Sequence, residues 1–275
     1  MKHVSVIIPT YYRHTYLADL LTMLLRQTMM PFEVIVADQT PESDRPSNFY
    51  NTFKEKMNLR VVDIEKPSLT YPRNKAAEMA NGEILLFLDD DIVISSNFVE
   101  SHMKVMEEEN VDVVNGAVTR RESLPDAYPW DVKQFDPVRY FLAAPNHHWQ
   151  GMMLSVSSCN CSIKKEMFLA VGGFDEKLPR MVDFELGYRL FRYGAKIYFS
   201  NKPFARHLRA QGGSRKAPKQ YDSLVSALYI HKKHFPGWIT TQFILKSIIS
   251  KKCFINPLSV LKIIRAHGVV DKLLK

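Results

Sequence analysis

The chain has 275 residues, of which 46% are hydrophobic and 24% charged, so it can bury a large core and is neither disordered nor fibrous. Its three cysteines are too few for a disulfide framework, which excludes the small secreted class and favours a reducing cytoplasm. No apolar stretch reaches the roughly 20 residues of a membrane-spanning helix, because the best candidate, residues 238–249, is interrupted by Gln242 and Lys246.

The net charge of +8 is concentrated near the C-terminus. From Arg206 onward the chain holds 14 of its 37 Lys and Arg residues but only two of its 29 acidic residues. Basic segments of this kind bind anionic lipid, phosphate groups or nucleic acid, although a solvated helix surface is the commoner explanation. Trp238 and Phe243 lie among these lysines, so the tail is compatible with peripheral binding at the inner face of a membrane, or with packing against the domain or a second copy of the chain. No nucleic-acid-binding motif is recognised, and nucleic acid is not expected as a partner.

The first third of the sequence alternates apolar strands with helical patterns, as parallel βαβ units do. Strands are predicted at 4–9, 32–37, 59–64 and 84–88, and helices at 17–25, 49–57 and 73–80. Ligands bind beyond the carboxyl ends of such strands, so residues 10–13, 38–40 and 89–91 should meet at one edge of the sheet. Neither the glycine-rich dinucleotide fingerprint nor a P-loop is present, so a nucleotide would be held differently there.

The rest of the chain is less regular. We predict a helix at 96–110, a strand at 111–118, a strand-like stretch at 152–163, a helix at 183–193, a strand at 196–200, and helices from 221 that are broken at Pro236 and Pro257. Residues 119–150 are rich in Pro, Tyr, Trp and His and show no regular pattern. Long irregular segments inside a compact domain tend to be functional.

Three adjacent carboxylates, Asp89, Asp90 and Asp91, follow the strand at 84–88. Their mutual repulsion is unfavourable unless a cation or several hydrogen-bond donors offset it. Oxygen ligands in small number suit Mg²⁺ or Mn²⁺, which can also share the oxygens of a bound diphosphate. The alternative is a solvated acidic turn in which Asp91 caps the segment that follows.

Several segments form an ordered series from Val4 to about Gly213: VSVIIPTYYR, VIVADQT, TYPRNKAAEMANGEILLFLDDDI, SSCNCSIKK, VGGFDE, DFELGYRL and RHLRAQGGS. In this order and spacing the sequence resembles the family-2 glycosyltransferases, which have the GT-A fold. The resemblance implies an α/β fold with a mostly parallel central sheet and a C-terminal helical extension. Residues 1–215 would form the catalytic domain, with a nucleotide-binding half at about 1–118 and an acceptor-binding half at 119–215, and residues 216–275 would form the basic helical extension.

The same resemblance implies a donor site. Pro9, Thr10 and Tyr12 would line the nucleotide pocket, and Asp38 would accept the imide N–H of a pyrimidine base, which favours UDP or dTDP donors. A carboxylate suits that role because it is acceptor-only, although an Asp that only forms a turn after a strand is the alternative. Arg73 would lie near the base or diphosphate.

Metal ligands are also implied by the resemblance, with Mn²⁺ or Mg²⁺ as the cofactor. Asp91 would be the direct ligand, while Asp89 and Asp90 would contact ribose or metal. His207 would add a further contact to the metal or the diphosphate, unless it is simply a packed histidine.

The implied reaction is displacement at the anomeric carbon of a nucleoside-diphosphate sugar by an acceptor hydroxyl, with inversion. Asp183 would be the general base, or else only the N-cap of its helix. Val182 replaces the Glu that usually precedes this Asp, and Glu185 would take over part of its contact with the acceptor. Trp149 is a candidate acceptor contact, and Arg215 a candidate charge on a loop that closes over the diphosphate.

The expected enzyme is a non-processive hexosyltransferase, because the Q-x-x-R-W element of polymer synthases is absent. Its partners would be a nucleotide sugar and a glycan or lipid-linked acceptor of the cell envelope. Two alternatives stay open. The chain could be a sugar-phosphate nucleotidyltransferase, although the glycine-rich phosphate loop of that class is missing, or a catalytically impaired nucleotide-sugar-binding protein, as Val182 would allow.

Overall fold

The structure is a computed structural model of the chain. It describes residues 3–119, 151–208, 210–211, 220–238, 240–241, 244 and 257–274. The predicted acceptor and loop residues Trp149 and Arg215 therefore lie outside the described residues.

A mixed sheet of nine strands forms the centre of the described part of the chain, with the order β3-β2-β1-β4-β8-β6-β9-β5 and with β7 beside β9. The strands are β1 (Val4–Thr10), β2 (Glu33–Asp38), β3 (Leu59–Asp63), β4 (Ile84–Leu88), β5 (Ile92–Ile94), β6 (Val113–Thr119), β7 (Gly151–Met152), β8 (Asn160–Lys164) and β9 (Ile197–His207). The first four run parallel, whereas β8 is antiparallel to both β4 and β6. All residues of β1, β2 and β4 are buried, as their near-continuous apolar sequences predict for strands covered on both faces.

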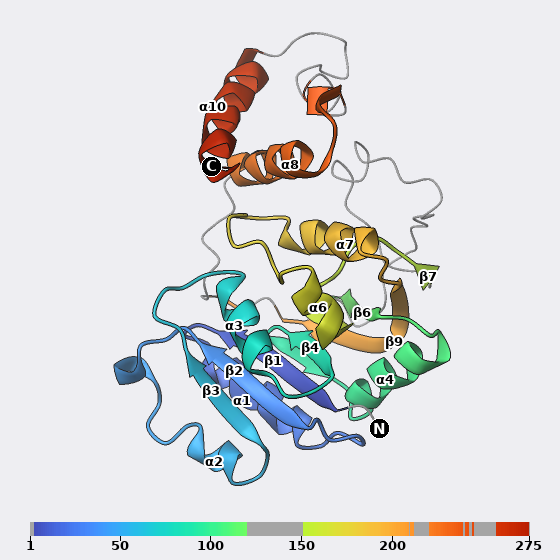
Figure 1. Ribbon diagram of the computed structural model, residues 1–275. Helices are drawn as coiled ribbons and strands as arrows, with labels where there is room; N and C mark the ends of the chain where they lie inside the picture. Colours follow the sequence, from blue (N-terminus) through green and yellow to red (C-terminus); the bar gives the residue numbers. More distant parts are fainter. Residues whose placement is uncertain are drawn as a thin grey trace.

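Helices cover both faces of this sheet (Figure 1). They are α1 (His14–Leu24), α2 (Asn51–Lys54), α3 (Tyr71–Met79), α4 (Phe98–Glu108), α6 (Lys165–Ala170), α7 (Val182–Arg192), α8 (Gln220–His234) and α10 (Pro257–Leu274), with a 3₁₀ turn at Glu42–Asp44. The leucines of α1 and the apolar side of α4 form one core with alternate residues of β1, β2 and β4. The other residues of these strands pack with α3, α6 and α7 in a second core, which extends into α8 and α10. The predicted α/β fold with a mostly parallel sheet is confirmed.

The differences from prediction fall where the hydrophobic pattern is ambiguous. The strand-like stretch at 152–163 contains only β7 and part of β8, and helix α6 follows β8 directly without a separating loop. Strand β9 continues to His207 instead of ending at residue 200. It pairs with β6 as far as Arg206, across a register shift between Gly116 and Val118, and its last three residues also pair with β5. In the part of the chain that the structure describes, no helix is long and apolar enough to cross a membrane.

Candidate active site

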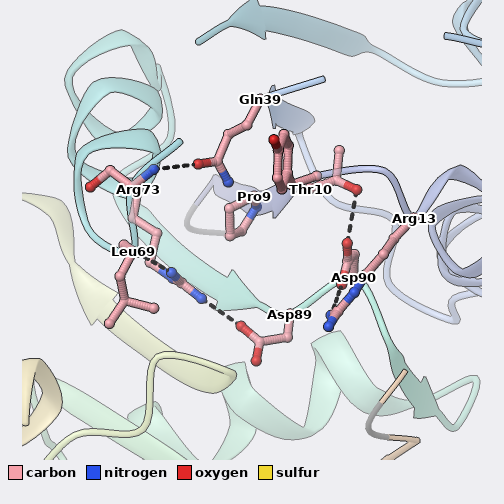
Figure 2. Close-up of a pocket in the computed structure, with 10 residues that line it drawn as sticks. Pro9, Thr10, Arg13, Gln39, Leu69, Arg73, Asp89 and Asp90 are labelled. Atoms are coloured by element: carbon pink, nitrogen blue, oxygen red, sulfur yellow. Dashed lines mark hydrogen bonds and ion pairs between the residues drawn. The ribbon is translucent and has the colours of Figure 1, made fainter. Parts of the chain in front are cut away.

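A pocket opens where β1, β2 and β4 end, as parallel strands require (Figure 2). Thr10 at the end of β1 is level with Asp38 at the end of β2, and the acidic triplet follows β4. The pocket is lined by Pro9, Thr10, Tyr11, Arg13, Gln39, Ser68, Leu69, Arg73, Asp89 and Asp90. The structure thus brings together four predicted donor-site residues besides Asp89, namely Pro9, Thr10, Arg73 and Asp90, and adds Arg13 and Gln39, which the sequence reasoning did not assign.

Each carboxylate of the triplet has a different set of partners. Asp90 accepts hydrogen bonds from Thr10 Oγ1 at 2.8 Å and from Arg13 Nη1 at 3.1 Å. Burial nevertheless raises the pKa of Asp90 to about 6, against the opposing effects of Arg13 and Thr10. Asp89 accepts from Arg73 Nη2 at 2.5 Å. Two arginines therefore offset most of the repulsion that the sequence predicts for this cluster.

Asp89, Asp91 and His207 each offer one ligand atom, and these atoms lie within 4.8 Å of one another. His207 reaches the triplet because β9 pairs with β5, which places it opposite Ile92. Asp91 Oδ2 accepts the backbone N–H of Ala210 at 2.8 Å, whereas Asp91 Oδ1 is buried and has no hydrogen-bond partner among the described residues. A buried carboxylate oxygen without a donor is costly unless a cation compensates it. Two carboxylates and an imidazole fit a divalent metal ion.

Arg73 is held in place by the start of α3. The Ser68 hydroxyl accepts the backbone N–H groups of Thr70 and Tyr71 at 3.3 Å, and Pro72 in the first turn is compatible with the helix. The Arg73 guanidinium also donates to the carbonyl of Leu69 at 2.5 Å. The Arg73 guanidinium is thus held both by the Leu69 carbonyl and by Asp89, toward which the side chain extends (Figure 2).

Asp38 is not among the residues that line this pocket and is fully buried. Its Oδ2 contacts His14 Nε2 at 2.9 Å, Tyr50 Oη at 2.6 Å and Arg45 Nε at 3.0 Å, and its Oδ1 accepts the N–H of Thr40 at 2.9 Å. Burial alone would raise its pKa, but these donors hold the pKa of Asp38 below its usual value. The carboxylate is therefore ionised and enclosed by protein donors.

Tyr12 has a left-handed backbone conformation (φ 54°) and a side chain that is half exposed. Its hydroxyl donates to Asp44, a bond that raises the pKa of Tyr12 to about 12. Its backbone N–H donates to Thr40 Oγ1 at 2.8 Å, which ties the loop after β1 to the loop after β2. The Tyr12 ring thus lies at the rim of the site beside Tyr11.

Asp183 occupies the first turn of α7, after Met181 in the left-handed conformation (φ 58°). Its Oδ1 accepts the backbone N–H of Ser158 at 3.2 Å. Burial raises the pKa of Asp183, while the hydrogen bond from Ser158 and the nearby charge of Arg73 oppose this shift. Asp183 also lines a second cavity, together with Asn115, Gly116, Val118, Met153, Ser155, Val156, Ser157, Phe184 and Phe199.

Backbone contacts fix the start of α7. A Cβ atom at Gly187 would lie 2.4 Å from the carbonyl oxygen of Leu154, so α7 packs directly on the segment before β8. Asn115 in β6 holds the same segment, donating to the Ser155 carbonyl at 2.6 Å and accepting the N–H of Ser157 at 2.9 Å. This packing fixes the first turn of α7, which places Asp183 in the lining of the second cavity.

Glu185 is also on α7 but points elsewhere. Its carboxylate is fully buried, and it contacts Arg189 at 2.6 Å, Lys233 at 2.8 Å and His234 at 2.9 Å. These partners lower the pKa of Glu185 to about 2, against the effect of burial. The structure turns the Glu185 carboxylate toward α8, whereas Asp183 lines the second cavity.

The residues that sequence reasoning did not assign carry weak local signals. Arg13 and Gln39 lie within the segments VSVIIPTYYR and VIVADQT, close to the ends of β1 and β2, and this position is their signal in the sequence. Asn115 lies in the middle of a predicted strand, where a buried amide has no distinguishing pattern. Their roles become visible only when the strands are assembled.

Comparisons with known proteins agree with this geometry. The family model "Glycosyl transferase family 2" matches residues 5–171. Among curated proteins, poly(ribitol-phosphate) beta-N-acetylglucosaminyltransferase TarS of Staphylococcus aureus is 33% identical over 118 residues, which is 42% of this chain and 20% of that protein. The chain thus matches only a fifth of the length of this relative.

Solved structures share the fold. TarS residues 1–349 from S. aureus, in complex with UDP-GlcNAc, has a TM-score of 0.65 at 18% identity and covers 99% of this chain and 82% of that one. GalNAc-T7 with UDP, GalNAc and Mn²⁺ has a TM-score of 0.69 at 14% identity, covering 98% of this chain and 55% of that one. These neighbours are GT-A enzymes, so the predicted GT-A fold is confirmed. Because the family model spans more than half of its length, the chain belongs to glycosyl transferase family 2.

Proposed function

We propose that this glycosyltransferase moves a hexose from a UDP or dTDP donor to an acceptor hydroxyl in one metal-dependent, inverting displacement. The observation that carries the proposal is the position of Asp183, which lines the second cavity and lies near enough to Arg73 and Asp89 for their charges to affect its pKa. We expect a donor sugar held at the triplet and an acceptor in the second cavity to meet near this carboxylate. The donor class is supported by the structural neighbours, TarS with UDP-GlcNAc and GalNAc-T7 with UDP.

In the proposed reaction the acceptor oxygen attacks the anomeric carbon while the bond from that carbon to the diphosphate breaks. The proton of the hydroxyl passes to the Asp183 carboxylate, and the electron pair of the broken bond leaves with the diphosphate. Burial raises the pKa of Asp183, which makes it a better base than an exposed aspartate. A single displacement from the face opposite the leaving group inverts the anomeric centre.

The leaving diphosphate needs positive charge. Asp89, Asp91 and His207 would hold Mn²⁺ or Mg²⁺, and the ion would supply Lewis-acid stabilisation of the departing diphosphate. Arg73 and Arg13 lie in the same pocket and add fixed cationic donors there. Because Asp183 can serve as the base and Arg13 and Arg73 supply positive charge, we favour an active enzyme over a catalytically impaired nucleotide-sugar-binding protein.

The proposed setting is the synthesis of a cell-envelope glycan or glycolipid in the cytoplasm, with one sugar added per encounter. It is supported by the relative TarS, whose name specifies a poly(ribitol-phosphate) acceptor. The basic C-terminal helices would bring the enzyme to a lipid-linked acceptor at the inner face of a membrane.

Release of UDP or dTDP from a panel of nucleotide sugars, with Mn²⁺ or Mg²⁺ and with no added acceptor, tests the proposal by slow donor hydrolysis. Asp183→Asn should keep donor binding in calorimetry but lower the release at least 100-fold, since general-base catalysis contributes about 10²–10⁴-fold. Asp91→Asn should remove the metal dependence of binding. The exposed Asp19→Asn on α1 is the matched control and should behave as wild type. If no donor is bound or hydrolysed with either ion, the proposed function fails.

A further inference from the structure

Asp38 occupies the sequence position predicted to read the donor base, but its surroundings leave no place for a ligand. Both carboxylate oxygens accept hydrogen bonds from protein groups at 2.6–3.0 Å, and the side chain has no exposed surface. A base could reach it only by displacing Tyr50 or His14 from these bonds. Removing those donors from an ionised, buried carboxylate is strongly unfavourable.

The next residue, Gln39, has the opposite arrangement. Its backbone N–H donates to the Thr10 carbonyl at 3.0 Å, and its side chain lines the pocket. The side-chain Oε1 accepts the backbone N–H of Ser68 at 2.7 Å, which fixes the orientation of the amide because only the oxygen can accept. The Nε2 group is therefore the free end, and no partner for it is found in the described residues. Figure 2 shows this nitrogen on the side of the Gln39 amide that points toward Pro9.

The position of Gln39 relative to the triplet matches the length of a nucleotide. Gln39 follows β2 and Asp89 follows β4, with β1 between them, so the two strand ends are separated by two strand spacings, roughly 10 Å. A diphosphate held near the triplet and its arginines would direct the base toward β2. The edge of a uracil that lies farthest from the ribose carries the 4-carbonyl oxygen, which accepts hydrogen bonds.

We propose that Gln39, and not Asp38, determines the base specificity of this enzyme, by donating a hydrogen bond from Nε2 to the 4-carbonyl of a uracil-type base. This inference rests on the proposed nucleotide-sugar donor. Cytosine carries an amino group at the same position, and two donors facing each other would repel. Gln39 thus selects UDP over CDP, while Asp38 is a positioning residue that holds the loops after β1 and β2 together.

The test measures the dissociation constants of UDP and CDP by calorimetry in the presence of Mn²⁺. The full-length wild type is compared with Gln39→Leu, Gln39→Glu and Asp38→Asn. Wild type should bind UDP about tenfold more tightly than CDP, the discrimination expected from one unsatisfied polar contact. Gln39→Leu should bring the two constants to within about twofold, and Gln39→Glu should reverse the preference, because its carboxylate accepts from the cytosine amino group. The ratio is the readout, since added negative charge or a local distortion weakens both ligands alike.

Asp38→Asn is the control. It should lower the melting temperature and leave the ratio of the two constants unchanged. If Asp38→Asn fails to fold, the two Gln39 variants still decide the question. A wild-type enzyme that prefers UDP, with the same ratio in both Gln39 variants, overturns this inference alone. A wild-type chain that binds neither UDP nor CDP overturns the inference together with the proposed function.

Discussion

Replacing Glu185 by Gln should destabilise the protein without acting through the donor pocket. Glu185 lies among Arg189, Lys233 and His234 at 2.6–2.9 Å, and it has no exposed surface. Glutamine has nearly the same shape but removes the negative charge. Arg189 would then face a neutral group in a buried place, and Lys233 would keep its pair with Asp175.

The magnitude follows from the pKa of the carboxyl. Its partners lower the pKa from an ordinary value of 4.5 to about 2, and each unit of difference between the folded and unfolded chain corresponds to about 1.4 kcal/mol. The charge of Glu185 therefore contributes about 3 kcal/mol to the free energy of unfolding at neutral pH. Because the folded pKa is depressed, this contribution is complete above pH 4.5 and is lost as the pH falls toward 2. At pH 3 about 1.5 kcal/mol should remain.

Urea unfolding of wild type and Glu185→Gln, followed by circular dichroism at pH 7 and pH 3, measures both numbers. Glu100→Gln is the matched control, because Glu100 forms an exposed pair with Lys104 on α4, and its stability should equal that of wild type at both pH values. A deficit below 1 kcal/mol at pH 7, or one that does not change with pH, would refute the reasoning. Donor hydrolysis measured well below the melting temperature should stay near the wild-type value; a raised KM for acceptor alone would instead support the predicted acceptor contact of Glu185.

Three further outcomes are expected. Because burial raises the pKa of Asp183 and the base must be ionised, turnover should fall on the acid side at a pH above the ordinary aspartate value of about 3.9; a pH–rate profile with its acid limb at or below pH 4 would contradict this role. Gly187→Ala forces a Cβ atom to 2.4 Å from the Leu154 carbonyl oxygen, so the free energy of unfolding in urea should fall by about 1–3 kcal/mol and turnover should drop. Gly268→Ala on α10 is the control, because the space around Gly268 is open and this variant should not destabilise the protein. Burial lowers the pKa of His102 to about 4, so between pH 6.5 and 4 the unfolded chain binds a proton that the folded chain does not. The free energy of unfolding should therefore fall by about 3 kcal/mol over this range, and His102→Gln should remove this pH dependence.

Much of the nucleotide side of the site follows from the sequence because it depends on local rules. Apolar runs that end in polar residues identify parallel strands, and parallel strands bring their carboxyl ends to one edge. Thr10, Asp89 and Asp90 are found together for this reason, whereas Arg73 reaches them from helix α3. His207 was reached only through family resemblance, since nothing local indicates that β9 continues past residue 200 to pair with β5.

The adjacent residues Asp38 and Gln39 show that side-chain direction at a strand end is not predicted by such local rules. Asp38 ends β2 and Gln39 follows it, and the sequence does not say which of them faces the pocket. The answer depends on His14 from α1 and on Arg45 and Tyr50 from the segment before α2, which close around Asp38. Likewise, the direction of Glu185 depends on α8, whose lysine is 48 residues farther along the chain.

The contact between α7 and α8 crosses the predicted boundary between the catalytic domain and the C-terminal helical extension. Arg180 donates its backbone N–H to Ser226 at 3.1 Å, Tyr229 donates to Asp175 at 2.8 Å, and apolar residues of α8 share a core with Leu186 of α7. A protein shortened at residue 215 would leave the buried Glu185 without Lys233 and His234 and would expose this apolar surface. We therefore expect the helix that carries Asp183 and the helices after residue 220 to unfold together, so that loss of the C-terminal helices changes the surroundings of Asp183.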